Sequence, residues 1–303
     1  MFGISEEDLV YVRFPRDESG ARYLESVRRE EIPPETFGAG PLGGSLQRPT
    51  SMVEAVERLL APDPEEVRRA SLVVPDGWLR LAFLEVDELP SGREARQEVL
   101  RWKLDRVVPV PAEDLRLVAV EDVGPAGEGS GGHRILVGFA REPLVAALED
   151  SFLGAGIEVG RIVNRTVASL PAVEEGNGEP GLRAVVNVFR GSYGLAFSHR
   201  DEPVLYRTKG FDGETGDGRR SETILQDLRL TRGFLREQRG DEPLTDVRLL
   251  AAPAHRSEWS RWLEEGLGLQ PRILTSRDLP VRGLDLSVEE AAPLLGVVLQ
   301  EIR

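Results

Sequence analysis

The sequence contains no cysteine, only two lysines and only three histidines among its 303 residues. The absence of cysteine excludes disulfide bonds, thiolate metal sites and cysteine nucleophiles. Arginine supplies 36 of the 38 basic residues, which we interpret as codon usage or a warm habitat and not as a functional signal. The histidines, His133, His199 and His255, fall at predicted turns or strand starts, and no pair has the spacing of metal ligands.

Positive charge and long apolar runs are also scarce. The formal net charge is −14, from 52 acidic and 38 basic residues. Because nucleic acids and anionic membrane surfaces are bound by neutralising phosphate, this balance argues against both as partners. No apolar run approaches the roughly 18 residues that cross a bilayer, and the N-terminus lacks the basic start and apolar core of a signal peptide. We therefore expect a cytoplasmic protein without direct membrane insertion.

A pattern of strand, tight turn, strand, tight turn and strand occurs twice. The first copy begins at Phe2 and ends near Val27, and the second begins near Ala184 and ends near Thr208. Polar and glycine-containing turns separate the strands in both copies, as in a β-meander. Because the pattern opens each half of a chain long enough for two domains, it indicates an internal duplication.

The residues between the two meanders predict a separate α+β block. From 78 to 162 the expected order is strand, helix, strand, strand, helix and strand, with the first helix ending before Pro109. The last helix of the chain is expected from about Ser287, which has capping-box spacing to Glu290. The predicted domains are 1–77 plus 163–176, an insertion over 78–162, and 182–303 with a small helical subdomain at about 211–243.

The sequence offers no convincing active site. Ser192 is one residue away from a Gly-x-Ser-x-Gly nucleophile elbow, and a strand follows it where the elbow needs a helix. The glycine-rich stretch from Gly38 to Gly44 lacks the lysine and the preceding strand of a phosphate loop. The carboxylates form no acid/base pair on one face, and no metal site is expected. These observations predict a protein that is not an enzyme.

The inserted block and the end of the chain resemble a known family, the type IV pilus assembly protein PilM. The similarity lies in the order and spacing of short motifs and covers nearly the whole chain. The motifs are Leu89-Pro90, Val107-Val108-Pro109, Leu136 to Ala140, Gly154-Ala155-Gly156-Ile157, Leu228-Arg229-Leu230-Thr231 and Gly296-Val297-Val298-Leu299.

This resemblance implies an α/β, actin-like ATPase fold related to that of the cell-division protein FtsA. The two meanders would belong to two duplicated RNase-H-like domains, and the block between them would be the inserted α+β subdomain. The resemblance also implies a cytoplasmic protein, peripheral to the inner membrane through its partners. Such proteins bind the N-terminal tail of the inner-membrane protein PilN and connect the pilus motor to the alignment complex.

The sequence departs from the family where the family binds ATP. The first phosphate turn would carry Ser5 and Glu6 in place of the usual residues, and the second reads Asn187, Phe189 and Gly191. The adenosine turn is Ala251-Ala252-Pro253-Ala254, without the usual glycines. Carboxylates at the first turn would repel phosphate. We therefore expect no cofactor and no ATP hydrolysis.

The helix over 91–106 and the turn after it form the predicted partner surface. Its apolar positions cover more of the helix than one core face needs. In this interpretation Trp102 packs inward, and an extended peptide with alternate apolar residues binds in a groove. The groove residues would be Leu100, Leu104, Val107, Val108 and Pro109. The alternative is that all of these are core residues.

The resemblance, together with the lack of an active site, therefore implies a non-enzymatic cytoplasmic adaptor of the type IV pilus inner-membrane assembly. Its partner would be the tail of a PilN-like protein, with other pilus motor components as further candidates. One alternative is the cytoplasmic scaffold domain of a type II secretion GspL-like protein; GspL continues into a transmembrane helix, so an end at Arg303 favours the pilus adaptor. The other alternative is an actin-like ATP-binding protein or ATPase, which would need a catalytic carboxylate that the sequence does not identify.

Overall fold

The computed structural model describes residues 1–15, 24–62, 67–125, 132–173, 181–200, 202–211, 217–240, 242–281 and 285–300. The chain divides into two compact units. One contains Met1–Tyr11 and Arg28–Asn164, and the other contains Val12–Val27 and Arg165–Arg303. Each unit has its own hydrophobic core.

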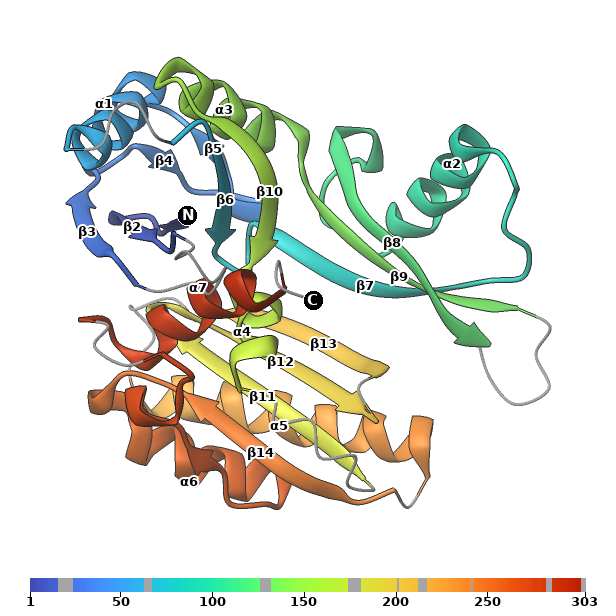
Figure 1. Cartoon of the computed structure of the whole chain (residues 1–303). Helices are drawn as coiled ribbons and strands as arrows, with labels where there is room; N and C mark the ends of the chain where they lie inside the picture. The colour runs from blue at the N-terminus through green and yellow to red at the C-terminus, as the bar shows by residue number, and fades with distance from the viewer. Residues whose placement is uncertain are drawn as a thin grey trace. The chain divides into compact units, whose positions relative to one another are not determined.

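The first five-stranded sheet has the order β3-β2-β1-β6-β10 (Figure 1). Strand β1 pairs antiparallel with β2 and parallel with β6, and β6 pairs parallel with β10. The predicted third strand over 21–27 lies partly outside the described residues, and the observed strand begins at Ser26. The strands are β1 (Phe2–Ile4), β2 (Asp8–Arg13), β3 (Ser26–Glu31), β6 (Arg69–Val74) and β10 (Glu158–Asn164).

The second five-stranded sheet repeats this arrangement, with the order β13-β12-β11-β14-β15. A meander of three antiparallel strands is again followed by two strands that add in parallel. The duplication predicted from the sequence is therefore confirmed. The strands are β11 (Leu182–Phe189), β12 (Ser192–His199), β13 (Glu202–Gly210), β14 (Leu244–Leu250) and β15 (Arg272–Ile273).

Two helices, α1 (Pro49–Leu60) and α3 (Glu142–Gly154), pack against each other and against the first sheet. The ring of Phe152 on α3 meets that of Phe2 on β1 edge to face, with centroids 5.0 Å apart. A two-stranded ribbon, β4 (Phe37–Gly38) and β5 (Ser45–Leu46), and the short helix η1 (Pro41–Gly43) lie between β3 and α1 in the chain.

A small third sheet of the order β7-β9-β8 is entirely antiparallel. Its core combines Leu84, Val137 and Phe139 from the strands with Leu100 and Leu104 from one helix. The elements are β7 (Leu79–Val86), α2 (Arg93–Leu104), η2 (Ala112–Asp114), β8 (Leu115–Pro125) and β9 (His133–Arg141).

The predicted insertion over 78–162 extends too far at its C-terminal end. Strand β10 pairs with β6 of the first sheet, with Ile162 opposite Leu72. Helix α3 contributes Leu148 and Phe152 to the core of that same sheet. Local sequence pattern did not separate these elements from the block, because parallel pairing joins strands far apart in the chain. The separate three-stranded sheet spans 79–141.

Four polar side chains, Arg116, Glu142, Glu149 and Asn164, fix the small sheet to the rest of its unit. Arg116 of β8 bridges two carboxylates of α3, with Nε 2.7 Å from Glu142 and Nη1 2.6 Å from Glu149. The Arg116 guanidinium lowers the pKa of the Glu142 carboxyl through this hydrogen bond. The buried Asn164 amide donates to the carbonyl of Leu79 at 3.1 Å.

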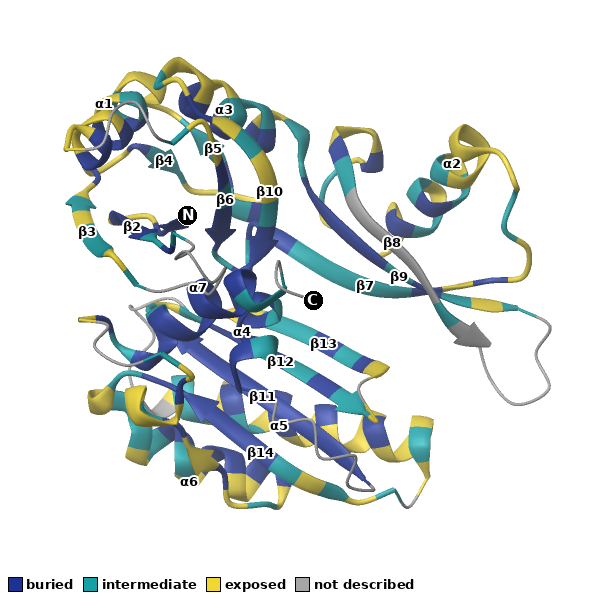
Figure 2. Cartoon of the chain, in the orientation of Figure 1, coloured by how far each residue is buried: buried dark blue, intermediate teal, exposed yellow. Residues whose placement is uncertain are grey.

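Four helices cover the second sheet. The side chains of β11 alternate, so Ala184, Val186 and Val188 face the core shared with α5 and α6. Figure 2 shows that the central strand β11 is almost entirely buried, whereas β13 is partly exposed. The helices are α4 (Arg165–Val173), α5 (Asp217–Arg239), α6 (Arg256–Leu267) and α7 (Val288–Gln300), with short helices η3 (Pro253–His255) and η4 (Ser276–Asp278).

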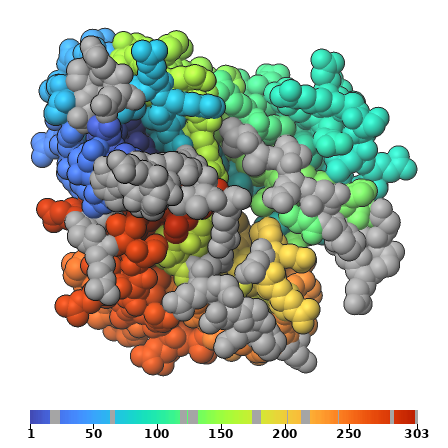
Figure 3. Space-filling model, in the orientation of Figure 1, coloured from blue at the N-terminus to red at the C-terminus, as the bar shows by residue number. Residues whose placement is uncertain are grey.

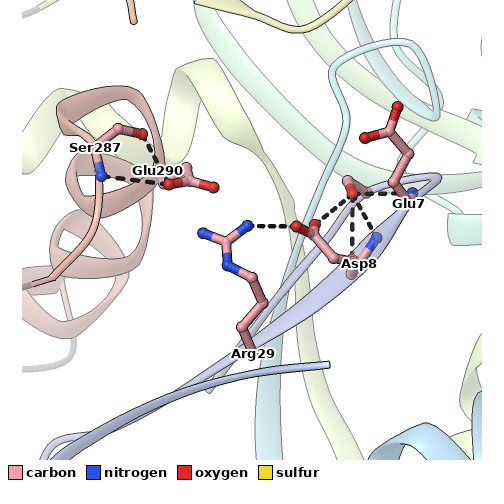
Figure 4. Close-up of polar contacts among 6 residues, drawn as sticks. Glu7, Asp8, Arg29, Ser287 and Glu290 are labelled. Atoms are coloured by element: carbon pink, nitrogen blue, oxygen red, sulfur yellow. Dashed lines mark hydrogen bonds and ion pairs between the residues drawn. The ribbon is translucent and has the colours of Figure 1, made fainter. Parts of the chain in front are cut away.

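Helix α4 packs on α7 and not within the first domain, where the prediction for 163–176 placed it. Gly296 of α7 makes this contact close, because an added Cβ would lie 1.8 Å from the Ala168 carbonyl oxygen. The predicted capping box of α7 is present: the Glu290 carboxylate accepts from the Ser287 hydroxyl at 2.8 Å and from its N–H at 3.3 Å (Figure 4).

The expected helical subdomain at about 211–243 is not separate from the second domain. Within its described part, α5 is one helix whose Ile224, Leu228 and Leu235 enter the core of the second sheet. Among the described residues, no helix is both long enough and apolar enough to span a membrane.

Candidate functional site

The first predicted phosphate turn, between β1 and β2, is closed by its own serine. The buried Ser5 hydroxyl accepts from the N–H of Asp8 at 3.0 Å and from that of Glu7 at 3.2 Å. It donates to the Asp8 carboxylate at 2.6 Å. Backbone N–H groups are the donors with which such a turn would hold a phosphate. Here two of them are already satisfied within the turn.

The charge at this turn is also negative. Glu6 and Glu7 are exposed, while Asp8 is buried and forms an ion pair with Arg29 of β3 (Figure 4). The Glu7 carbonyl accepts from the N–H of Ile32 at 2.7 Å, which fixes the turn to the end of β3. Ser5 and Glu6 lie in a turn between β1 and β2, as predicted, whereas the sequence pattern gave no sign of Arg29 as the cation that neutralises Asp8.

The second predicted phosphate turn, between β11 and β12, holds an aromatic ring and two arginines. The Arg165 guanidinium lies 3.6 Å from the centroid of the Phe189 ring, and that of Arg190 lies 5.2 Å from it. Arg165 begins α4 and also donates to the Glu289 carbonyl at 3.4 Å. Phenylalanine therefore occupies a position where a glycine would let a phosphate approach the backbone.

Two further residues of this turn have distinct environments. Arg190 adopts a left-handed backbone with φ of 50°, and the Gly191 carbonyl accepts from the Phe211 N–H at 2.7 Å. Asn187, at 1% exposure, lies opposite Gly194 on one side and Leu250 on the other. Its amide carries no charge, so it supplies none of the attraction for Mg²⁺ that a carboxylate would provide.

Aromatic side chains pack near the start of α6, after the predicted adenosine turn. The Trp259 ring has its centroid 4.9 Å from that of Tyr193 and 5.4 Å from that of Trp262. The ring centroid of Phe211 lies 6.2 Å from that of Trp259, and the Arg220 guanidinium lies 4.1 Å from the Phe211 centroid. Within the turn, the Ala251 carbonyl accepts from Arg256 Nε at 3.0 Å. The described residues contain no cluster of metal-binding side chains.

The predicted partner surface on α2 has the reverse orientation to the one expected. Leu100 and Leu104 are fully buried in the core of the small sheet, and Trp102 is 54% exposed. The physical reason is helical spacing: residues four apart share a face, whereas Trp102 lies two positions from each leucine and points away. The groove assigned to the two leucines is therefore wrong.

The end of α2 nevertheless carries an exposed apolar surface. Val107 is 65% exposed, Pro109 is exposed and Val108 is half-buried. The Arg106 guanidinium lies 3.9 Å from the centroid of the Trp102 ring, and Lys103 Nζ lies 5.6 Å from it. We call Trp102, Val107 and Pro109 the α2 surface. The segment that contains α2 is visible at the surface of its own unit (Figure 3).

Sequence comparisons identify no relative, whereas structural comparisons cover the whole chain. No family model and no curated protein matches the sequence. A chain of the PilM–PilN type IV pilus biogenesis complex is 19% identical and has a TM-score of 0.76, with 100% of this chain and 98% of that chain covered.

Two further solved structures are similar in fold over most of the chain, with lower TM-scores. The cytoplasmic domain of EpsL, an inner-membrane component of the type II secretion system of Vibrio cholerae, is 13% identical with a TM-score of 0.52, covering 98% of this chain and 93% of that chain. A Bacteroides thetaiotaomicron protein of unknown function with an actin-like ATPase fold is 10% identical and has a TM-score of 0.53. The match covers 90% of this chain and 89% of that chain. The chain thus has an actin-like α/β fold, as the sequence predicted, and its architecture is similar to that of the PilM–PilN structure.

Proposed function

We propose that this chain is a protein-binding scaffold of a type IV pilus assembly machine and that it holds the N-terminal tail of a PilN-like membrane protein. The observation that carries the proposal is the whole-length similarity in fold to a chain of the PilM–PilN complex. The scaffold would act at the cytoplasmic side of the inner membrane and be held there through its partners. Pilus motor components are further candidate partners.

The two turns support a role that needs no nucleotide. Ser5 accepts from two amides of the first turn, and at the second turn the Phe189 ring packs against the Arg165 guanidinium. An actin-like ATPase would instead need open amides and a carboxylate for Mg²⁺ at these places. We therefore propose that the chain acts through surfaces and not through catalysis.

The α2 surface is our proposed docking site for the tail. Trp102 and Val107 offer apolar area that no described residue of the chain buries, and Arg106 and Lys103 place positive charge beside the ring. This combination suits an extended segment with an apolar anchor and a neighbouring acidic or carbonyl oxygen. The half-buried Val108 lies between Val107 and Pro109 beyond the end of the helix, while Leu100 and Leu104 hold the surface in place from below.

A tail peptide labelled with a fluorophore tests the proposal by anisotropy, with the tail taken from a PilN-like protein of the same organism. We expect Trp102→Ala and Val107→Ser each to weaken binding about tenfold or more, because buried aromatic anchors dominate such contacts. The melting temperature should stay close to that of the unmodified protein. Leu153→Ser is the matched control, since Leu153 is 64% exposed on α3 and outside the α2 surface.

The results of this binding experiment distinguish a wrong docking site from a wrong function. If the tail binds with equal strength to every variant, the chain is a scaffold and the α2 surface is the wrong site. If the tail does not bind the unmodified protein, the pilus assignment fails. In that case the type II secretion scaffold becomes the better candidate, because the EpsL cytoplasmic domain has the same fold over 98% of this chain.

A further inference from the structure

Helix α5 has an outer face that its own unit does not cover. Its inner side chains Ile224, Leu228 and Leu235 are buried in the core of the second sheet. On the opposite side, Leu230 is 59% exposed and Phe234 is 40% exposed. Two large apolar side chains four positions apart form a continuous stripe on a helix.

A glycine lies between these two apolar side chains. Gly233 stands in the interior of a 23-residue helix, where glycine is unfavourable relative to alanine. A Cβ added at Gly233 would meet nothing within 4 Å, so packing inside the chain does not require the glycine. A shallow surface hollow of about 390 Å³ lies over this face and is lined by Gln226, Arg229, Leu230, Gly233, Phe234 and Glu237. Such a notch allows another backbone to approach the helix closely.

The charges around the notch are arranged symmetrically. Arg229 stands four residues before Gly233, and Glu237 stands four residues after it. When two copies of this helix pack antiparallel about a two-fold axis at Gly233, Arg229 of each copy lies opposite Glu237 of the other. The same operation brings the Leu230 and Phe234 stripes together over the notch. One helix face therefore contains both halves of a self-complementary contact.

We propose that the face of α5 formed by Gln226, Arg229, Leu230, Gly233, Phe234 and Glu237 is a homodimer contact, and that its occupant is the same face of a second copy of this chain. Arg229 is 2.6 Å from Glu265 of α6, with both side chains at least 49% exposed. Exposed ion pairs of this kind contribute little stability. Arg229 can therefore turn from Glu265 to the second copy at small cost.

The contact forms a weak dimer. One helix on each side buries less than the roughly 1,200 Å² at which stable interfaces begin. Dimerisation is consequently concentration-dependent, and salt weakens it because two exposed charge pairs contribute.

Sedimentation velocity of the full chain over a range of protein concentrations tests this contact. We expect Glu237→Arg alone to weaken dimerisation about tenfold, because the new guanidinium of one copy then lies opposite Arg229 of the other. Arg229→Glu alone should do the same by opposing two glutamates. The double variant Arg229→Glu, Glu237→Arg restores opposite charges and should return to within about threefold of the unmodified protein.

A second pair of variants tests the notch. Gly233→Leu fills it and should abolish the dimer without lowering the melting temperature, since the added side chain enters open space. Gln238→Leu is the control, because Gln238 is exposed on the same helix but lies outside this face. A monomer at every concentration overturns the proposal. A dimer that tolerates Gly233→Leu, or one that the double charge variant fails to restore, also overturns it.

Discussion

The hydroxyl of Tyr193 donates a 2.7 Å hydrogen bond to the carboxylate of Asp227, which joins strand β12 to helix α5. Asp227 is 1% exposed, and Lys209 Nζ lies 2.6 Å from it. Arg207 is a second cation, with Nη1 3.8 Å from the Asp227 carboxylate. The same nitrogen donates to the Thr231 hydroxyl of α5 at 2.6 Å. A buried carboxylate is tolerated here because cations from β13 and a phenol from β12 compensate its lost hydration.

Replacing this carboxylate is expected to destabilise the second unit. Asp227→Asn keeps the volume but removes the charge that faces Lys209 and Arg207. Because both cations are partly exposed and can regain water, we expect a loss of about 2–3 kcal/mol in the free energy of unfolding. Urea denaturation measures this loss. The control is Asp150→Asn, at an exposed residue of α3, which should change stability by less than about 0.5 kcal/mol.

Alkaline pH should weaken the same contact through Tyr193. Burial, and then the hydrogen bond to Asp227, raise the pKa of the Tyr193 hydroxyl above its usual value. Tyrosine in the unfolded chain ionises near pH 10, so above that pH the unfolded state binds fewer protons than the folded state. The contribution of Tyr193 to stability is therefore fully present below about pH 10 and is lost as the pH rises further.

Urea titrations between about pH 8 and 11 measure this dependence on both sides of the ordinary tyrosine pKa. The slope attributable to one tyrosine approaches about 1.4 kcal/mol per pH unit. Tyr193→Phe should reduce the alkaline loss by that amount, although it is less stable at neutral pH. Equal slopes in the two proteins would show that Tyr193 ionises as easily in the folded state as in the unfolded one.

The first turn should depend on its serine. Ser5→Ala removes the acceptor for two N–H groups and the donor to Asp8. We expect a loss of about 1–2 kcal/mol, because the amide of a buried turn is left without its partner. The measurement is again urea denaturation. Ser91→Ala, at an exposed serine before α2, is the control, and an equal effect at both positions would contradict this account of the turn.

Nucleotide binding is expected to be absent or very weak. Isothermal titration of the unmodified protein with Mg·ATP should give no measurable heat, because two amides of the first turn are occupied and its exposed carboxylates repel phosphate. No hydrolysis of ATP should be detected by phosphate release. Micromolar binding would show that the chain is an ATP-binding member of this fold. It would also show that the occupied amides and the carboxylates of the first turn do not prevent nucleotide binding.

The sequence predicts those parts of the fold that depend on local pattern. The two meanders follow from alternating strands and punctuated turns, and the Ser287–Glu290 capping box follows from three-residue spacing. The parallel addition of β10 to the first sheet does not, because its partner β6 lies far earlier in the chain. The ion pair of Asp8 with Arg29 escaped prediction for a similar reason, since it depends on how β2 and β3 align.

The orientation of α2 could have been predicted from spacing alone. Leu100 and Leu104 are four residues apart and form one helical face, and an i, i+4 leucine pair is a stronger core signal than a single tryptophan between them. The inward position predicted for Trp102 is wrong, because the leucines fill the observed core. The arginine beside Trp102 in the next turn, Arg106, is the signal for an exposed ring.

This orientation predicts that two neighbouring substitutions in α2 lower the stability by very different amounts. Leu104→Ala leaves a cavity in the core of the small sheet and should cost about 2–5 kcal/mol. Trp102→Ala removes a ring that is 54% exposed and should cost less than about 1 kcal/mol. Thermal unfolding of both variants measures the difference. If Trp102→Ala were the more damaging of the two, the ring would be part of the core, and the α2 surface could not be the docking site for the tail.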